Sequence, residues 1–248
     1  MGVLILALVA GAVVGLSLGA LGGGGGILTV PALVGLLGVP PVAAGTAGLL
    51  VVTVTSVTAL TLHARDGLVR WRTGLLFAAA GVPTALAGGA VAARLPDAAL
   101  TGAFALIATA AALRMLFPGA PDDGVRPPRP GRAFAAGAGL GATTGVLGVG
   151  GGFLAVPALT GVLGLRMREA AGTSLLVITT NSLAALSTRA GTTEGLDWGV
   201  LAPFAGAAVL GAWDGNRLAA RVSGRMLRRV FAVVLLAVAA FMTVRTLA

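Results

Sequence analysis

Cysteine and lysine are absent from this chain of 248 residues, and histidine occurs once. The lack of cysteine excludes disulfide bonds and thiolate metal sites. One histidine and eight carboxylates leave little material for a catalytic or metal-binding cluster. Charged side chains make up only 10% of the residues, against about 25% in a soluble domain. With 57% hydrophobic residues and a mean hydropathy of +1.00, the chain is predicted to be an integral membrane protein.

The net charge of +9 comes from seventeen arginines. A balance this basic would ordinarily indicate nucleic-acid binding. Here the arginines lie in short loops between apolar stretches, where basic residues set the orientation of a membrane protein. We therefore expect the lipid bilayer, and no nucleic acid, as the partner of this charge.

Apolar stretches predict an all-helical, multi-pass protein. A helix needs roughly 17–25 apolar residues to cross the hydrocarbon core of a bilayer, which is about 30 Å thick. We expect such helices at Gly2–Leu21, 43–62, 73–93, 98–117, 133–149, 170–188, 198–218 and 226–247, with shorter apolar segments at 27–37 and 153–163. The first span lacks a basic start and a convincing cleavage site, so we interpret it as retained and not as a signal peptide.

The sequence contains an internal repeat. A shift of 126 residues places GGGGGILTVPAL (22–33) on GVGGGFLAVPAL (148–159). A shift of 127 places Gly45-Thr46 on Gly172-Thr173, and Trp71 on Trp198. We therefore divide the chain into a first repeat (1–117), a hydrophilic linker rich in proline (118–132) and a second repeat (133–248).

Loop charge predicts that the two repeats are inverted. The middle loop of the first repeat is basic, with Arg65, Arg70 and Arg72, whereas that of the second repeat carries Glu194 and Asp197. Because basic loops face the cytoplasm, we expect loop 65–72 and the linker inside, and 194–197 outside. Inverted repeats are typical of secondary transporters. The charges leave open whether the segments beside the glycine runs span the membrane or are re-entrant.

The glycine runs are the leading candidates for a binding site. Each glycine costs a helix roughly 1 kcal/mol relative to alanine, so the runs predict breaks. Non-helical backbone at membrane depth is tolerated where protein buries it or it lines a watery cavity. The helix starts that follow would offer free N–H groups to an anion, and a proline one turn further in would shape each helix. The residues are Gly22, Gly23, Gly24, Gly25, Gly26 and Pro31, and then Gly148, Gly150, Gly151, Gly152 and Pro157. The alternative is tight helix packing through small residues.

Hydroxyl and amide side chains on the following spans could add donors for a small oxyanion. Thr46, Thr173, Ser174 and Asn181 are the candidates, although hydrogen bonds within or between helices are an alternative role for each. An ionisable residue within a span is a functional candidate, and we expect Asp214 to pair with Arg217 or Arg221, with a role in a proton relay as the alternative. We interpret His63 as an interfacial residue.

The repeated glycine break with its proline, the GTSLLVITTNS stretch, and the Gly-Leu-x-x-Trp and Gly-Leu-Asp-Trp segments resemble the TauE/SafE family, also called the sulfite exporter family. The resemblance covers nearly the whole chain. It implies transport of small sulfur-containing anions, such as sulfite or organosulfonates, across the bacterial cytoplasmic (inner) membrane. One departure is Ala47, which stands where the second repeat has Ser174, and this leaves the hydroxyl contact of the first repeat in doubt.

The hypothesis from the sequence is thus a secondary transporter that works by alternating access and needs no cofactor or metal. The coupling ion, a proton or sodium, and the oligomeric state are left open. The alternatives are a transporter of another small anion or metabolite, a membrane-embedded enzyme, and a structural partner protein. An enzyme would need clustered ionisable groups within the spans, and a structural protein would have no use for repeated polar breaks.

Overall fold

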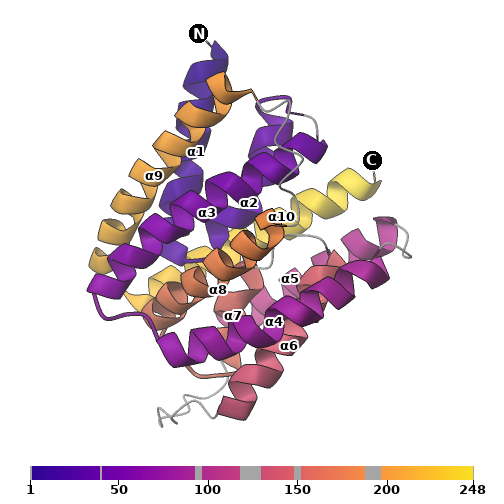
Figure 1. Ribbon diagram of the computed structural model, residues 1–248, viewed down its shortest axis with the longest axis vertical. Helices are drawn as coiled ribbons and strands as arrows, with labels where there is room; N and C mark the ends of the chain where they lie inside the picture. Colours follow the sequence, from indigo (N-terminus) through magenta and orange to yellow (C-terminus); the bar gives the residue numbers. More distant parts are fainter. Residues whose placement is uncertain are drawn as a thin grey trace.

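The computed structural model describes residues 2–39, 41–92, 97–117, 130–147, 152–187 and 197–247, which form ten helices and no strand (Figure 1). The helices are α1 Gly2–Leu21, α2 Gly24–Gly35, α3 Pro41–Arg65, α4 Trp71–Ala92, α5 Asp97–Leu116, α6 Pro130–Leu147, α7 Gly152–Gly161, α8 Met167–Ser187, α9 Trp198–Arg221 and α10 Gly224–Leu247. Every predicted segment is matched by a helix whose ends differ from the prediction by at most three residues. The all-helical prediction is confirmed for the part of the chain that the structure describes.

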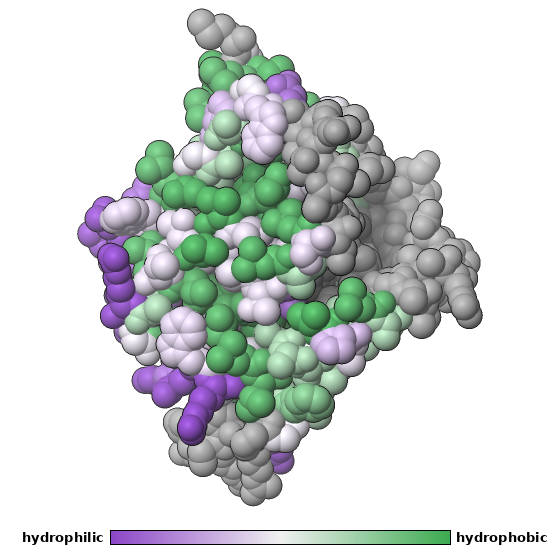
Figure 2. Space-filling model, in the orientation of Figure 1, coloured by the Kyte–Doolittle hydropathy of each residue, from purple (hydrophilic) through white to green (hydrophobic). Residues whose placement is uncertain are grey.

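Several helices have the dimensions of membrane spans. Within the described residues, α1, α8 and the Ala43–Arg65 part of α3 are long and apolar enough to cross a membrane. The helices α4, α5, α9 and α10 have 20 to 24 residues, which also matches the hydrocarbon thickness. Figure 2 shows apolar side chains over most of the described face, with hydrophilic ones gathered along the edge where α3 and α9 end.

Two closely packed helix pairs are built on glycine. In the first pair, a Cβ on Gly11 would meet the Phe204 carbonyl oxygen and one on Gly15 would meet that of Ala208. The contacts advance together along both helices, which shows that α1 and α9 run parallel. In the second pair α6 runs parallel to α4 in the same way, with Gly137 against Phe77. Figure 1 shows the two pairs on opposite sides of the molecule. Small residues let helix backbones approach this closely.

The two pairs correspond to each other under the sequence repeat. The shift of 126 residues relates Gly11 to Gly137, and the shift of 127 relates Phe77 to Phe204. Helix α1 of the first repeat therefore packs on α9 of the second, while its counterpart α6 packs on α4 of the first. The remaining counterparts contact each other directly, α3 with α8, α5 with α10, and α2 with α7. Each repeat thus depends on the other for its main helix contacts.

The helices α3 and α8, which carry most of the predicted hydroxyl residues, cross at the centre of this arrangement. The Thr179 hydroxyl of α8 donates to the Ser56 hydroxyl of α3 at 3.0 Å. Nearer the end of α3, His63 lies against the start of α8, where a Cβ on Gly172 would stand 3.2 Å from the His63 Cβ. The end of α3 therefore lies beside the beginning of α8, and the two helices run antiparallel. Almost all of the first half of α8 is buried.

Candidate functional site

The first glycine break joins α1 to α2 in two residues. Gly22 has a φ of +76°, in the left-handed region that side chains disfavour, and its N–H donates to the Leu18 carbonyl at 2.8 Å. Gly23 is the N-cap of α2, and no side chain of a described residue caps this helix start. Gly24, Gly25 and Gly26 already belong to α2, so the prediction that the whole run precedes the helix is wrong.

Gly22 brings the break against the second repeat. A Cβ on Gly22 would collide with the Ala171 carbonyl oxygen and would lie 2.6 Å from the Ser174 hydroxyl oxygen of α8. The break can approach α8 only because Gly22 has no side chain. Two of the predicted binding residues, Gly22 and Ser174, are therefore neighbours in space although 152 positions separate them in the sequence.

The next glycines of the run differ in what surrounds them. A Cβ on Gly25 would stand 2.5 Å from the Val14 carbonyl oxygen and 2.5 Å from the Leu18 Cβ, so Gly25 packs α2 against α1. At Gly26 the nearest described atom would be the Val52 Cγ2 at 3.9 Å, which is ordinary contact. Helix packing is thus one role of the run, at Gly25, while Gly26 has room for a side chain.

The predicted hydroxyl residues are buried. Thr46, Thr173 and Ser174 have at most 1% of their surface exposed. The Thr173 hydroxyl accepts a hydrogen bond from the Arg70 backbone N–H at 3.1 Å, and the Ser174 hydroxyl donates to the Ala171 carbonyl at 2.8 Å. The Asn181 Oδ1 atom is buried and has no hydrogen-bond partner among the described residues. Asn181 is therefore the predicted binding residue with an unused polar atom.

Most of the second glycine break lies outside the described residues. Gly148, Gly150 and Gly151 are among the residues that are not described, and Gly152 is the first residue of α7. Pro157 lies inside α7 as Pro31 lies inside α2, in agreement with the repeat. The pairing of two breaks around one anion remains a prediction.

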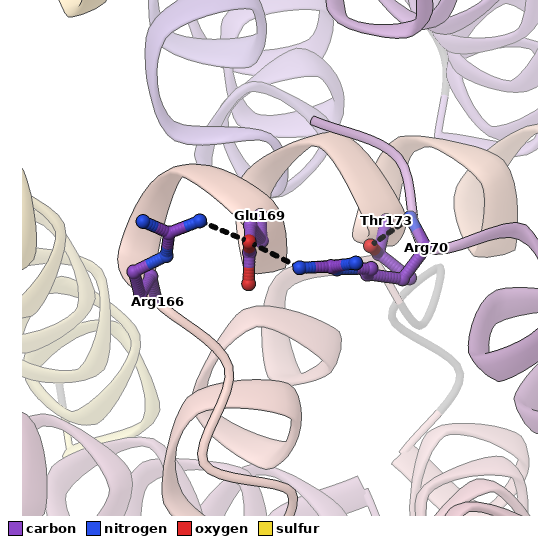
Figure 3. A network of polar contacts seen from close by, with 4 residues as sticks. All are labelled: Arg70, Arg166, Glu169 and Thr173. Carbon is purple, nitrogen blue, oxygen red and sulfur yellow. Dashed lines mark hydrogen bonds and ion pairs between the residues drawn. The ribbon is translucent and has the colours of Figure 1, made fainter. Parts of the chain in front are cut away.

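A charged cluster that the sequence reasoning missed lies at the start of α8 (Figure 3). The Glu169 Oε1 atom accepts hydrogen bonds from the Nη2 atoms of both Arg70, at 2.7 Å, and Arg166, at 2.6 Å. The Glu169 side chain is 6% exposed, and those of Arg70 and Arg166 are 52% and 75% exposed. The hydrogen bond and charge of Glu169 raise the pKa of the Arg166 guanidinium above its ordinary value, so Arg166 remains charged. A glutamate three positions after an arginine, in the first turn of an otherwise apolar helix, was the available signal.

Basic loops from both repeats meet at this end of the molecule. Arg168 donates to the carbonyls of Ala219, Ala220 and Val222 at 2.7–3.0 Å and so caps the end of α9. The Asn216 amide donates to the Asp66 carboxylate at 3.3 Å. The loop around 66–70, the segment 166–169 and the end of α9 at 216–222 therefore lie on one side of the molecule.

The predicted ion pair of Asp214 is wrong, and His63 is more buried than an exposed loop residue would be. Asp214 is exposed and forms no ion pair with Arg217, Arg221 or any other described residue. The Arg217 guanidinium instead lies over the Trp213 ring, 5.6 Å from its centre. His63 is buried, with 2% of its surface exposed, and its Nδ1 lies 3.0 Å from the Ala59 carbonyl oxygen. His63 is thus covered by α8, two residues before the end of α3, and its position at the membrane interface stays a prediction.

Two other kinds of site were sought in the described residues. No three histidine, aspartate or glutamate side chains there come together in a way that could hold a metal ion. A hollow of about 570 Å³ lies on the first half of α10. Its lining is Ser223, Arg225, Met226, Arg229, Val230, Val233 and Val234, which includes none of the predicted binding residues.

Comparison with known proteins identifies the family of this helical chain. The sequence model of the family described as "Sulfite exporter TauE/SafE" matches residues 7–242. The chain belongs to the TauE/SafE family. This membership makes it a multi-pass membrane protein and a transporter.

Curated relatives of this TauE/SafE chain carry the description "Probable membrane transporter protein". One, from Xylella fastidiosa strain 9a5c, is 33% identical over 252 residues, with 98% of this chain and 96% of the relative covered. Another, from strain Temecula1 / ATCC 700964, is 32% identical over 253 residues with the same coverage. No solved structure matches the chain.

Proposed function

We propose that this TauE/SafE protein is a secondary transporter of small sulfur-containing anions, such as sulfite or an organosulfonate, in the bacterial cytoplasmic membrane. The observation that carries the proposal is the family match over residues 7–242, since that family is described as sulfite exporters. The anion would be held at the two glycine breaks, Gly22–Gly26 and Gly148–Gly152, and moved by alternating access.

The geometry of the first break supports an oxyanion site. The start of α2 has a helix N-terminus without a side-chain cap from the described residues, and such a terminus favours negative charge. The second turn of α8, which carries Thr173 and Ser174, lies against this break. Backbone N–H groups with hydroxyl groups beside them suit a small anion of either one or two charges. Asn181 would add the N–H groups of its amide, as predicted from the sequence; its buried Oδ1 atom is an acceptor and would not itself favour an anion.

The helix arrangement supports the inverted repeats that alternating access commonly uses. The counterparts α3 and α8 run antiparallel, as repeats of opposite orientation require. The reciprocal pairs α1–α9 and α4–α6 would allow one set of helices to rock against the other while equivalent contacts are exchanged.

Uptake into proteoliposomes tests the proposal. Purified protein should take up radiolabelled sulfite or a small organosulfonate faster than protein-free vesicles, and unlabelled sulfite should compete. An imposed proton or sodium gradient that accelerates uptake would identify the coupling ion. Uptake of a sulfur-free anion or metabolite alone would overturn the substrate class. No uptake of any solute tried would overturn the proposal that the protein is a transporter of small anions.

A further inference from the structure

The charged cluster at the start of α8 has a surplus of positive charge. Two guanidinium groups, of Arg70 and Arg166, share one carboxylate, that of Glu169. An arginine has five N–H donors, and among the described residues the side chain of each of these two arginines donates only to Glu169. Donors and net charge are therefore left over on two side chains that are at least half exposed.

The spacing of the two arginines is set by a single oxygen atom. Both Nη2 atoms donate to Glu169 Oε1, at 2.7 and 2.6 Å (Figure 3). The two guanidinium groups are thus already close enough for one oxygen of a sulfite or sulfonate group to accept from both. Arginine forks bind oxyanions through such charge-assisted hydrogen bonds.

The cluster and the first glycine break contact the same two turns of α8. Ser174, which Gly22 contacts, is five residues after Glu169 on α8, a rise of about 7.5 Å along the helix. Between them, Thr173 accepts a hydrogen bond from the Arg70 backbone, and a Cβ on Gly172 would stand 2.9 Å from the Leu68 carbonyl oxygen. The loop that carries Arg70 therefore packs on the same two turns of α8 as the break, but on the face opposite to the one that Ala171 and Ser174 present to Gly22.

We propose that Arg70 and Arg166 form an outer binding site for a small oxyanion at the basic end of the protein, and that the Glu169 carboxylate fills this site until the oxyanion displaces it. The proposal rests on the proposed function, since it adds an entry site to the same path. The arginines come from different repeats, so the incoming anion bridges the two halves in place of Glu169.

A purely structural ion-pair cluster predicts a different pattern of mutant effects. If the cluster only holds the loop on α8, removal of either side of the ion pairs loosens the same contact, and both changes act on transport in one direction. If Glu169 competes with the substrate, Glu169→Gln frees both guanidinium groups and strengthens anion binding. Loss of the arginines weakens it, so the two changes act in opposite directions.

The test measures sulfite uptake by full-length protein in proteoliposomes, with KM and kcat determined separately. Glu169→Gln should lower KM, and Arg70→Gln combined with Arg166→Gln should raise it, each by about ten-fold, the scale of one hydrogen bond to a charged group. The kcat at saturating sulfite should change little, because the outer site acts before translocation. Arg72→Gln removes the same charge from an exposed arginine near the same loop and should leave KM within about two-fold.

A second double variant keeps the test decisive if the Glu169→Gln protein does not fold, which thermal unfolding would reveal. Arg70→Lys with Arg166→Lys keeps the positive charges that hold Glu169 but loses the planar forks, so KM should still rise while thermal stability is kept. A shift of KM in the same direction for Glu169→Gln and the glutamine double variant would overturn the outer site, as would an unchanged KM in both double variants. No sulfite uptake by the unmodified protein would instead overturn the proposed function, and the outer site with it.

Discussion

At the scale of single residues, Gly25 and Gly26 separate packing from binding within one glycine run. A methyl group at Gly25 would press on the backbone of α1, so we expect Gly25→Ala to lower the free energy of unfolding by about 1–3 kcal/mol. Gly26 has room for a methyl group, and Gly26→Ala should keep the stability or raise it by up to about 1 kcal/mol. If the start of α2 binds the anion, the same methyl should crowd it and weaken sulfite binding by about 1.5–3 kcal/mol.

Thermal unfolding in detergent and equilibrium sulfite binding on the same preparations measure both quantities. The two variants make the same chemical change at adjacent positions, so each is the control for the other. Gly26→Ala protein that binds sulfite as tightly as the unmodified chain would reduce the first break to a packing device.

Residues that function through distant partners were the ones that sequence reasoning missed. Arg70 and Glu169 are 99 positions apart and meet only because α3 and α8 run antiparallel, so neither segment alone shows that the two residues pair. Asp214 was assigned a partner within its own helix, yet Arg217 lies over Trp213 instead. Burial of His63 likewise depends on α8, since Gly172 lets the second repeat approach it.

At the scale of helices, the reciprocal glycine contacts predict equal sensitivity at equivalent positions. A Cβ on Gly15 of α1 would meet the backbone of Ala208, and one on the equivalent Gly141 of α6 would meet that of Gly81. We expect Gly15→Ala and Gly141→Ala each to destabilise the protein by about 1–3 kcal/mol. Gly139→Ala lies on the same helix as Gly141 with no described atom within 4 Å of its Cβ, and should not destabilise it.

Unfolding of the three variants in one detergent tests this equivalence. A large loss for Gly15→Ala with none for Gly141→Ala would contradict equal roles for the two helix pairs. A loss of stability in all three variants would mean that the fold does not tolerate alanine at any of these glycines, and would not support a special role for the two helix contacts.

Helix positions were predictable because hydropathy and the repeat act locally. Each of the ten helices was located from its apolar stretch, and the repeat placed α7 where α2 had been seen in the first copy. The start of α2 was misjudged because helix propensity counts against Gly24–Gly26. The contact of Gly25 with α1 outweighs that propensity, and no propensity scale contains a contact between two helices.

At the scale of the whole molecule, the convergence of the basic loops predicts its orientation. The loops around 66–70, 166–169 and 216–222 share one end, and the bias of arginine toward the cytoplasm places that end inside. Because the chain has no native cysteine, single cysteines report sidedness cleanly. In intact cells, Arg72→Cys and Gly124→Cys should resist an impermeant thiol reagent, whereas Glu194→Cys should react.

Permeabilised cells provide the control, since all three cysteines should then be modified. Reaction of Gly124→Cys from the outside of intact cells would reverse the orientation. Reaction of Arg72→Cys and Glu194→Cys from the same side would contradict the inversion of the two repeats.

The exchange of helix partners between repeats has a consequence for synthesis of the chain. When α1 and α4 leave the ribosome, their glycine faces have nothing to pack on, because their partners α9 and α6 lie in the half that is still to be made. We therefore expect the first half to complete its main helix packing only after the second half has been inserted. An ancestor of half this length would have met the same need by pairing two copies of itself, and gene duplication would then have joined what was already a dimer.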